Sequence, residues 1–328
     1  MLSRRQTLKS LAALSASLAL PACQAQERQQ QQAETSQTRS LASAAQTFHP
    51  FDFDKRTVKL NNGIDMPIIG IGVWTLTPEQ AEKSVSVALK AGYRLIDTAR
   101  MYRNEEAVGR AVRNSGIARK DIFITTKIYG SGDYSNAEAA INNRLKALGV
   151  DYIDLLLLHY PDQNDTQAWQ VMEQFVRTGK IRAIGLSNYH RKTFSRIMEV
   201  ASITPAVVQN EVHIYNQDKH TKEFLKSYGT QMEAWYPLGG RDSYGKGGKD
   251  ILFAEPVIVT LAQKYRKTPA QILLRWQLQA ANIAIPGSSN PAHIRENIAI
   301  FDFSLADAEM ATISKLDKKT KFSTFGGE

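Results

Sequence analysis

Eight short apolar segments, separated by longer amphipathic stretches, constrain the fold of this chain more than any other feature. They lie near residues 68–74, 94–99, 122–128, 154–159, 181–187, 206–212, 231–236 and 282–287. Between them, Pro78–Lys90, Glu105–Asn114 and Asn136–Leu148 carry apolar residues at helical spacing, with helix starts expected at Thr77 and Ser135. Strands that alternate with helices are typical of parallel sheets with crossover connections. Eight such units over about 250 residues predict a (β/α)8 TIM barrel.

A β-hairpin is predicted before the first barrel strand. Thr57–Leu60 and Met66–Ile68 flank the turn sequence Asn61-Asn62-Gly63. We expect this hairpin to close the bottom of the barrel. No Gly-x-Gly-x-x-Gly fingerprint follows a predicted strand, so a Rossmann cofactor domain is not indicated.

Ionisable side chains stand where several predicted strands end. Asp97 ends one apolar run and is followed closely by Tyr102, while Lys127 and His159 end two later runs. Barrel enzymes assemble their active sites at these strand ends. Tyrosine, with a pKa of about 10, is a poor acid until a cation stabilises its anion. We expect Lys127 to supply that cation, Asp97 to hold Lys127, and His159 to orient a carbonyl oxygen beside Tyr102.

Motifs at the strand ends resemble those of a known enzyme family. They are Ile71-Gly72-Val73-Trp74, Asp97-Thr98-Ala99 with Tyr102, Asn104 and Glu105, Leu155–His159 with Tyr160-Pro161, Gly185-Leu186-Ser187-Asn188, Gln209-Asn210-Glu211, Ala234–Gly239, and Ile285–Ser288 through Glu296-Asn297. From about Thr57 to Asp317 the chain resembles the aldo-keto reductases, and within them the bacterial branch that includes diketogluconate reductases. Tyr160 stands where the family usually has Trp.

The resemblance implies an NAD(P)H-dependent oxidoreductase that reduces aldehydes or ketones to alcohols. In this reading a hydride reaches the carbonyl carbon and Tyr102 donates the proton, tuned by Lys127 and Asp97. The small-molecule carbonyl substrate would lie against His159, Trp74 and Tyr160. No metal is expected, because the histidines show neither HExxH nor Cys/His ligand spacing.

The same resemblance assigns residues to NADPH or NADH. Trp235 would stack on the nicotinamide ring, and Ser187, Asn188 and Gln209 would hydrogen-bond its carboxamide. The segment Leu238–Asp250, rich in Gly and charge, would be a loop that closes over the pyrophosphate. The other residues assigned to the cofactor are Gly72, Val73, Trp74, Tyr236, Leu238, Pro286, Ser288, His293, Glu296 and Asn297.

Two positions depart from the pattern of members that prefer NADPH. Gly287 and His293 stand where those members generally carry Lys and Arg, which pair with the 2′-phosphate. Each charge-assisted contact of this kind contributes about 1.5–3 kcal/mol. The sequence therefore predicts relaxed or NADH-leaning specificity, although Ser288 and Arg295 leave room for NADPH.

The N-terminus resembles an export signal. Ser3–Lys9 contains a twin-arginine pair, Leu8–Leu20 is a short apolar stretch, and Leu20-Pro21-Ala22-Cys23 resembles a bacterial lipobox. Residues 1–23 are thus predicted to be an export signal with lipidation at Cys23, residues 24–56 a flexible Gln/Ser/Thr-rich linker, and residues 57–328 the barrel. An ordinary secretory peptide cleaved nearby is the alternative. In both cases the protein is expected outside the cytoplasm. It would be periplasmic or, if Cys23 is lipidated, anchored to a bacterial membrane through that lipid only.

Composition supports one globular domain with this extension. The hydrophobic content of 43% is enough for a sizeable core, and the net charge of +9 is scattered along the chain rather than gathered into a nucleic-acid-binding module. We expect a monomer that binds no nucleic acid. Two alternatives stay open at this point. A nucleotide-binding redox sensor or regulatory subunit predicts bound dinucleotide with negligible turnover, and an anchored scaffold with a relict site predicts no dinucleotide affinity.

Overall fold

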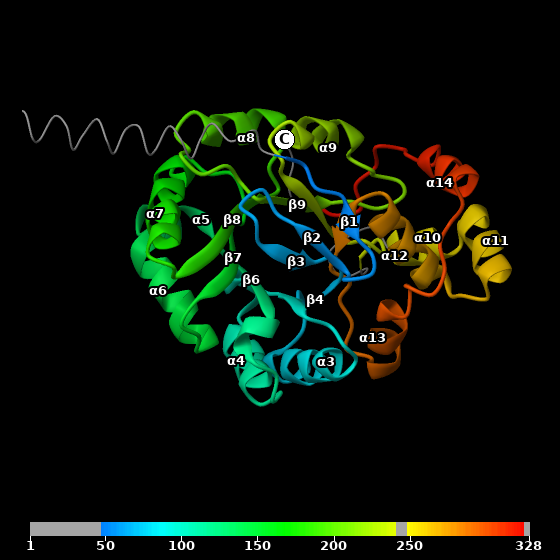
Figure 1. Ribbon diagram of the computed structural model, residues 1–328, viewed down its shortest axis with the longest axis horizontal. Helices are drawn as coiled ribbons and strands as arrows, with labels where there is room; N and C mark the ends of the chain where they lie inside the picture. Colours follow the sequence, from blue (N-terminus) through cyan, green and yellow to red (C-terminus); the bar gives the residue numbers. More distant parts are fainter. Residues whose placement is uncertain (1–46, 241–247, 325–328) are drawn as a thin grey trace, which may run out of the picture. The chain divides into compact units, whose positions relative to one another are not determined.

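Eight parallel strands form the central sheet in the part of the chain that the structure, a computed structural model, describes: residues 47–240 and 248–324 (Figure 1). Each strand pairs with its neighbours in chain order, and bridges Ile69–Ala284 and Gly72–Gly287 bring the last strand to the first. The predicted (β/α)8 barrel is confirmed. The strands are β4 (Gly70–Gly72), β5 (Leu95–Asp97), β6 (Phe123–Ile128), β7 (Ile153–Leu158), β8 (Ile181–Ser187), β9 (Val207–Glu211), β10 (Gln231–Trp235) and β11 (Asn282–Ala284).

Helices surround these strands (Figure 1). They are α3 (Pro78–Lys90), η1 (Arg100–Tyr102), α4 (Glu105–Arg113), η2 (Arg119–Asp121), α5 (Gly130–Ser135), α6 (Ala137–Leu148), α7 (Asp165–Arg177), α8 (Arg191–Met198), α9 (Lys219–Lys226), α10 (Gly248–Phe253), α11 (Pro256–Tyr265), α12 (Pro269–Gln279), α13 (Pro291–Ile298) and α14 (Asp307–Ser314). The strands they cover are buried on both faces: every residue of β7 is buried.

The predicted helix start at Thr77 is confirmed. The Thr77 hydroxyl accepts a hydrogen bond from the Gln80 amide at 3.3 Å, and the Gln80 side chain accepts one from the Thr77 amide at 3.1 Å. This capping box satisfies two amides that the helix itself leaves free.

The predicted start at Ser135 is wrong. Ser135 ends the short helix α5, where its hydroxyl donates to the Ser131 carbonyl at 2.7 Å, and α6 begins at Ala137. The Asp133 carboxylate explains the additional helix, because it accepts from the Tyr129 amide at 2.9 Å and pairs with Arg100 at 2.8 Å.

A three-stranded antiparallel sheet closes the bottom of the barrel. It contains β1 (Phe51–Asp52), β2 (Thr57–Lys59) and β3 (Asp65–Pro67), which lie in front of the barrel strands in Figure 1. At its turn, Asn61 Nδ2 donates to the Pro205 carbonyl at 3.1 Å and Asn62 Nδ2 donates to the Arg182 carbonyl at 3.1 Å. Because Pro205 precedes β9 and Arg182 lies at the start of β8, the turn contacts the amino ends of the strands, as predicted.

The predicted linker does not extend to residue 56. β1 pairs with β2 through Phe51–Val58 and Asp52–Thr57, so the folded sheet begins before the expected boundary at residue 57. Phe51 and Phe53 also pack on the barrel core, which the polar composition of residues 24–46 does not suggest. The export signal, Cys23 and the linker up to Gln46 lie outside the described residues.

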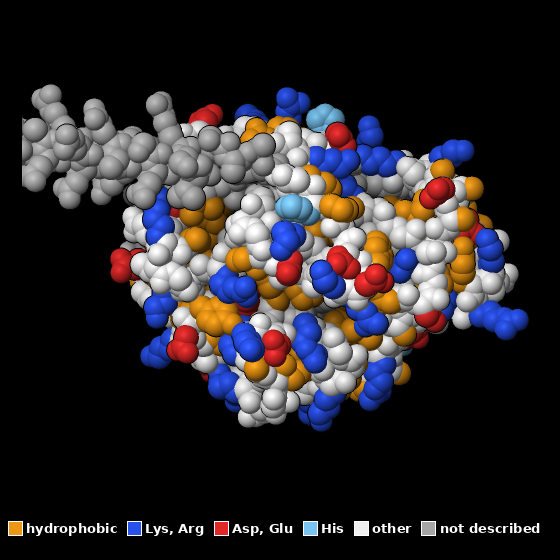
Figure 2. Space-filling model, in the orientation of Figure 1, with side chains coloured by type: hydrophobic (Ala, Val, Ile, Leu, Met, Phe, Trp, Pro, Cys, Tyr) orange, Lys and Arg blue, Asp and Glu red, His pale blue; other side chains and the backbone are white. Residues whose placement is uncertain are grey.

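Charged side chains are interspersed on the face of the molecule seen in Figure 2. Lysine and arginine alternate there with aspartate and glutamate instead of forming one region of a single sign. Among the described residues, no helix combines the length and the apolar character needed to cross a bilayer. Nor do those residues bring three His, Cys, Asp or Glu side chains together in an arrangement able to hold a metal ion.

Candidate active site

A cavity of about 400 Å³ opens at the carboxyl ends of the barrel strands. Most of the predicted site residues line it: Gly72, Trp74, Asp97, Tyr102, His159, Tyr160, Ser187, Asn188, Gln209, Trp235, Tyr236, Leu238, Pro286, Ser288, His293, Glu296 and Asn297. The topology explains this gathering, because parallel strands direct all their carboxyl ends to one face. Residues more than two hundred positions apart in the sequence therefore share one cavity.

Lys127 joins the predicted catalytic residues. Its ammonium lies 2.7 Å from both carboxylate oxygens of Asp97, 3.1 Å from the Thr98 carbonyl and 3.2 Å from the Tyr102 hydroxyl. The Lys127 side chain has no exposed surface, and that of Asp97 is 3% exposed. A charge buried in this way needs a partner of opposite charge, which Asp97 supplies. Lys127 thus lies behind the cavity wall and presents Tyr102 to the cavity.

The phenol of Tyr102 is held neutral. Burial raises the pKa of Tyr102 well above its ordinary value of 10.0, and the nearby Asp97 and Glu233 raise it further. Lys127, which we expect to stabilise the Tyr102 anion, contacts the hydroxyl at 3.2 Å. Both carboxylate oxygens of Asp97 also contact the ammonium, and the negative charge of Asp97 opposes ionisation of the phenol. A neutral phenol suits a proton donor.

His159 is neutral as well. Burial lowers the pKa of His159 well below its ordinary value of 6.5, and the charge of Lys127 lowers it further. Its ring lies 5.8 Å from the Tyr102 ring, centroid to centroid, so both side chains face the same part of the cavity. Its Nδ1 is buried and has no hydrogen-bond partner among the described residues. An uncharged imidazole beside a phenol can donate a hydrogen bond to an incoming oxygen without competing for its proton.

Aromatic rings surround Tyr102 and His159. The Trp74 ring lies 4.8 Å from Tyr102, and the Tyr160 ring stacks on His159 at 4.9 Å with an interplanar angle of 23°. Tyr129 adds a third ring, 5.7 Å from His159. The resulting wall suits a flat or apolar carbonyl compound.

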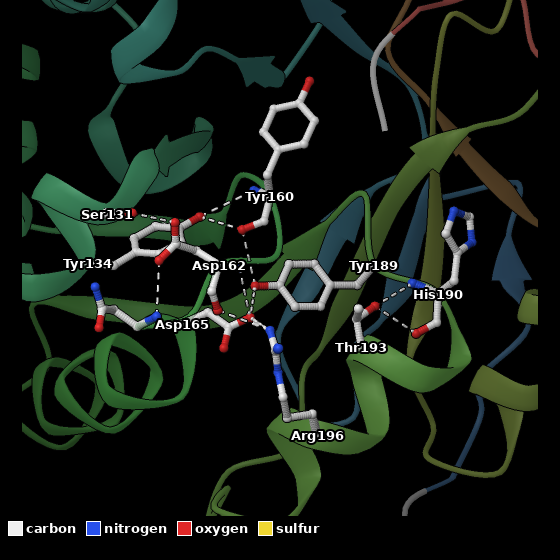
Figure 3. Close-up of polar contacts among 10 residues, drawn as sticks. Ser131, Tyr134, Tyr160, Asp162, Asp165, Tyr189, His190, Thr193 and Arg196 are labelled. Carbon is white, nitrogen blue, oxygen red and sulfur yellow. Dashed lines mark hydrogen bonds and ion pairs between the residues drawn. The ribbon is translucent and has the colours of Figure 1, made fainter. Parts of the chain in front are cut away.

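A network of polar contacts supports the backbone at Tyr160 (Figure 3). The Tyr160 carbonyl accepts hydrogen bonds from the Tyr134 hydroxyl at 2.9 Å and the Tyr189 hydroxyl at 3.3 Å, and its amide donates to Tyr134 at 3.2 Å. In Figure 3 the Tyr160 ring points away from these contacts. The network therefore fixes the backbone while leaving the ring to the cavity.

Asp165 stabilises the same network through its carboxylate. Its buried carboxylate accepts from the Tyr189 hydroxyl at 2.8 Å and pairs with the Arg196 guanidinium on α8 (Figure 3). Asp162, at the same turn, accepts from the Ser131 hydroxyl of α5 at 2.6 Å. Contacts from α5, α7 and α8 thus hold the loop after β7, which carries His159 and Tyr160.

Gln209 differs from its predicted arrangement. Its Nε2 donates to Asp97 Oδ2 at 2.8 Å and to Glu233 Oε2 at 2.7 Å. With both N–H groups directed at carboxyl oxygens, Oε1 is the only polar atom of the amide left for the cavity. Gln209 can therefore accept a hydrogen bond from a bound group but has none to donate.

Val73 does not reach the cavity, although the resemblance assigned it to the cofactor. It is fully buried; its amide donates to the Asp97 carbonyl at 3.1 Å and its carbonyl accepts from Asn104 Nδ2 at 3.0 Å. Both polar groups of Val73 are therefore used to hold the turn after β4. Its neighbours Gly72 and Trp74 line the cavity instead.

Three cavity residues have a left-handed backbone without being glycine. They are Thr75 (φ 69°), Asn188 (φ 64°) and Tyr236 (φ 53°). For a β-branched residue such as Thr75 this conformation is unfavourable, and such strain concentrates at functional sites. Asn188 is held by hydrogen bonds from its Nδ2 to the His159 carbonyl at 3.0 Å and to Ser187 Oγ at 3.1 Å.

The far end of the cavity is suited to a phosphate group. Ser288 and Asn290 precede α13, and the Asn290 side chain caps this helix by accepting from the Ala292 amide at 2.9 Å. Helix N-termini favour anions. Gly287 lies against Gly72: a Cβ on Gly287 would stand 2.9 Å from the Gly72 carbonyl oxygen. Ser288, Asn290 and the ring of Trp235 line the same cavity as Tyr102, and this combination of polar groups and an aromatic ring suits a dinucleotide.

The segment predicted as a mobile loop is partly helical. Gly248–Phe253 form α10, and Lys249 and Phe253 line the cavity. Residues 241–247 lie outside the described residues. The predicted span Leu238–Asp250 is therefore too long at its carboxyl end, where apolar Ile251, Leu252 and Phe253 continue a helix that packs on the C-terminal segment.

Glu211, at the end of β9, binds the chain's own C-terminal segment. Its Oε1 accepts from the Phe322 amide at 2.6 Å, and its Oε2 accepts from the Ser323 hydroxyl at 2.6 Å. His213 Nε2 also lies 3.0 Å from Oε1. Glu211 belongs to the strand-end motif Gln209-Asn210-Glu211, but its carboxylate is used structurally.

Sequence reasoning missed several residues of the site. Met101 and Phe253 line the cavity, and Tyr129 stands at the aromatic wall. Tyr129 follows Lys127 by two positions at a strand end, which was a usable signal. Glu233 was missed because it lies in the middle of strand β10 rather than at its end, and no sequence motif identifies it as a site residue.

Comparisons with known proteins agree with this geometry. The Aldo/keto reductase family matches residues 68–318. Morphine 6-dehydrogenase of Pseudomonas putida is 41% identical over 268 residues, which cover 79% of this chain and 90% of that protein. Methylglyoxal reductase DkgA of Yersinia pestis is 40% identical over 263 residues, which cover 79% of this chain and 92% of that protein. The crystal structure of MGS-M4, an aldo-keto reductase enzyme from a Medee basin deep-sea metagenome library, is 37% identical with a TM-score of 0.77 and covers 82% of this chain and 97% of that one. The chain belongs to the aldo/keto reductase family and is an oxidoreductase that reduces carbonyl groups with NADPH or NADH.

Proposed function

We propose that Tyr102 donates the proton to the substrate's carbonyl oxygen, with Lys127, Asp97 and His159 as its partners. One observation carries this assignment: the ammonium of Lys127 bonds both the Asp97 carboxylate at 2.7 Å and the Tyr102 hydroxyl at 3.2 Å at the cavity wall. A buried ion pair placed against a phenol at a cavity wall is better explained by proton transfer than by a role in stability.

The proton moves along a short path in this proposal. When bound, reduced nicotinamide would supply a hydride to the carbonyl carbon. His159 orients the carbonyl oxygen, and Tyr102 Oη gives that oxygen its proton, which completes the alcohol. The phenolate left behind is stabilised by the hydrogen bond from Lys127, and a proton from solvent restores the phenol.

We propose that the cofactor lies in this cavity and is held by the residues that the resemblance assigns to it, most of which line the cavity. Trp235 offers a flat face for the nicotinamide ring, while Ser187, Asn188 and the Oε1 atom of Gln209 bind its carboxamide. Ser288, His293 and the N-terminus of α13 hold the adenosine phosphate end. Tyr236, Leu238, Pro286, Glu296 and Asn297 line the same cavity.

We propose relaxed or NADH-leaning cofactor specificity. Gly287 carries no side chain to pair with a 2′-phosphate, and its approach to Gly72 leaves no room for a Cβ unless the backbone shifts. His293 retains only a pH-dependent charge. Steady-state kcat/KM for NADH and NADPH with one aldehyde tests this. A strong preference for NADPH would contradict it.

We propose that the substrates are small or flat aldehydes and ketones, including 2-oxoaldehydes. The rings of Trp74, Tyr129 and Tyr160 provide an apolar wall beside Tyr102. The names of two relatives, methylglyoxal reductase and morphine 6-dehydrogenase, bracket this range from a small dicarbonyl to a flat polycycle. A panel of methylglyoxal, an aromatic aldehyde and a sugar would rank them, with the sugar expected last.

We further propose that residues 1–23 direct export and that Cys23 is lipidated, so that the protein is periplasmic or anchored to a membrane by lipid. The support is the twin-arginine sequence Arg4-Arg5 followed by an apolar stretch and a lipobox. Cell fractionation of the full chain and of Cys23→Ala tests the anchor. We expect the variant in the soluble fraction, and equal distribution of both proteins would rule the anchor out.

One experiment tests the proposed chemistry. Purified protein is mixed with NADH or NADPH and an aldehyde, and the loss of reduced cofactor is followed beside Tyr102→Phe. We expect the variant to lose roughly 10²–10⁴-fold in kcat/KM, the range for a positioned proton donor, while binding the cofactor normally. Turnover that survives the substitution would show that another group supplies the proton.

A further inference from the structure

Glu233 is a buried carboxyl that the proposed chemistry does not use. It lies on β10 opposite Gln209 of β9, has no exposed surface, and accepts a hydrogen bond from Gln209 Nε2 at 2.7 Å. Its second oxygen, Oε1, is buried and without a hydrogen-bond partner among the described residues. A buried carboxylate normally has a cation or several donors, so this one lacks what an ionised form needs.

The charge balance around Glu233 also indicates that its carboxyl is protonated. Gln209 Nε2 also donates to Asp97, and the Lys127 ammonium contacts both oxygens of the Asp97 carboxylate. One buried ammonium therefore faces two buried carboxyls. With Glu233 protonated the group is neutral, and with Glu233 ionised it carries one uncompensated negative charge.

No other group described near Glu233 removes this imbalance. The charged or titratable groups that act on it are Asp97 from β5 and Lys127 from β6, and Tyr102 from η1 is itself affected by Glu233. The strand β9 contributes Gln209, which does not titrate, and β11 contributes the apolar Ile283 opposite it. Burial, with Asp97 beside it, raises the pKa of Glu233 from 4.5 to about 8.

We propose that Glu233 is a positioning residue that holds a proton in neutral solution, fixes the orientation of the Gln209 amide, and selects oxidised cofactor when it ionises. The inference rests on the proposed function, in which Gln209 meets the nicotinamide carboxamide. The oxidised nicotinamide ring carries a positive charge and the reduced ring does not. A negative charge on the other side of Gln209 therefore favours the oxidised cofactor.

The first test concerns the proton alone. Infrared spectra at about pH 6.5 should contain a carbonyl band of a protonated carboxyl that Glu233→Gln lacks and that wild type loses on titration above its pKa. Glu173→Gln is the matched control, because Glu173 is also buried but lies on α7, bonded to Trp169 and Ser202. If Glu233→Gln and wild type give the same spectrum, the proposal is overturned.

The second test measures cofactor selection by tryptophan quenching. NAD⁺ and NADH are used, because neither has a 2′-phosphate that titrates. Between about pH 6.5 and pH 9, we expect the affinity for NAD⁺ relative to NADH to rise about fivefold or more in wild type, the lower end of couplings between sites. The ratio should stay constant in Glu233→Gln and should follow wild type in Glu173→Gln. A parallel rise in Glu233→Gln would overturn the proposal.

A measurement on wild type alone guards against a variant that does not fold. Calorimetry at about pH 8 in two buffers of different ionisation enthalpy counts the protons released on binding. We expect NAD⁺ to release a fraction of a proton that NADH does not. Equal release would overturn the selection of oxidised cofactor. Failure of both dinucleotides to bind would overturn the proposed function as well, and the infrared band would still decide whether Glu233 holds its proton.

Discussion

Lys127 shows how strongly one residue of this site depends on its partner. Its ammonium is fully buried and lies 2.7 Å from Asp97. Replacing Lys127 with Met would leave the Asp97 carboxylate buried beside Glu233 without a cation. We expect the free energy of unfolding, measured with urea, to fall by about 3–5 kcal/mol.

A surface pair provides the control for that loss. Lys55 pairs with Asp52 at 3.3 Å, but the two side chains are 77% and 41% exposed. Lys55→Met should change the free energy of unfolding by no more than about 0.5 kcal/mol. Similar losses in the two variants would mean that the Lys127–Asp97 pair contributes no more than an exposed one.

Glu233 should also make stability depend on pH. Its pKa is raised from 4.5 to about 8, so the folded protein holds this proton more tightly than the unfolded chain does. Its contribution to stability is therefore full below about pH 4.5 and is lost as the pH rises toward 8. Urea midpoints at pH 5 and pH 8 should show wild type losing stability relative to Glu233→Gln. A constant difference between the two proteins would contradict the raised pKa.

At the scale of helices, a glycine in α4 sets how closely α4 packs on the end of α6. A Cβ on Gly109 would lie 2.0 Å from the carbonyl oxygen of Leu148, a backbone atom that cannot turn away. Helix propensity alone predicts that Gly109→Ala stabilises by about 1 kcal/mol. We expect the opposite, a loss of about 1–3 kcal/mol in thermal or urea unfolding, because α4 and α6 must separate.

Gly132 in α5 offers the matched comparison. It too lies inside a helix, but a Cβ there would meet nothing within 4 Å. Gly132→Ala should therefore be neutral or stabilising by up to about 1 kcal/mol. If the two substitutions had the same sign, packing of α4 on α6 would not be the deciding effect.

At the scale of the whole molecule, Glu211 connects three distant parts of the chain. Its carboxylate at the end of β9 binds the Phe322 and Ser323 amides, and the Phe322 ring stacks on His213 at 4.5 Å. Gly248 of α10 packs against that ring, since a Cβ on Gly248 would stand 2.2 Å from it. The C-terminal segment therefore supports the helix that carries Lys249 and Phe253 to the cavity.

Weakening this connection should loosen one edge of the molecule without unfolding the barrel. For Glu211→Gln we expect faster amide hydrogen exchange, roughly 10-fold for a loss of about 1.4 kcal/mol, in residues 248–253 and 319–324. Exchange in peptides from β6 and β7 should be unchanged in Glu211→Gln. In the control Glu309→Gln on α14, exchange in residues 248–253 and 319–324 should also be unchanged. Uniformly faster exchange would show that Glu211 stabilises the whole barrel instead.

Local patterns in the sequence were enough to determine the barrel, its bottom hairpin and most of the cavity. Parallel strands must send their carboxyl ends to one face, so Asp97, Lys127 and His159 had to meet once the alternation was recognised. The Thr77 capping box was likewise readable, since its contacts span only three residues. The expected helix start at Ser135 was wrong because Ser135 ends a short helix, α5, that the sequence pattern did not predict. The Arg100–Asp133 ion pair that supports α5 joins residues far apart in the sequence, which no local pattern reveals.

Only the tertiary structure decided how charge is distributed among these groups. Burial raises the pKa of Tyr102 although Lys127 is adjacent, and the charge of Asp97, from a strand thirty residues before Lys127, raises it further. Glu233 and the orientation of Gln209 depend on pairing between β9 and β10, and Glu211 on a C-terminal segment more than one hundred residues away. Burial and long-range contacts set these energies, and neither is a property of any short stretch of sequence.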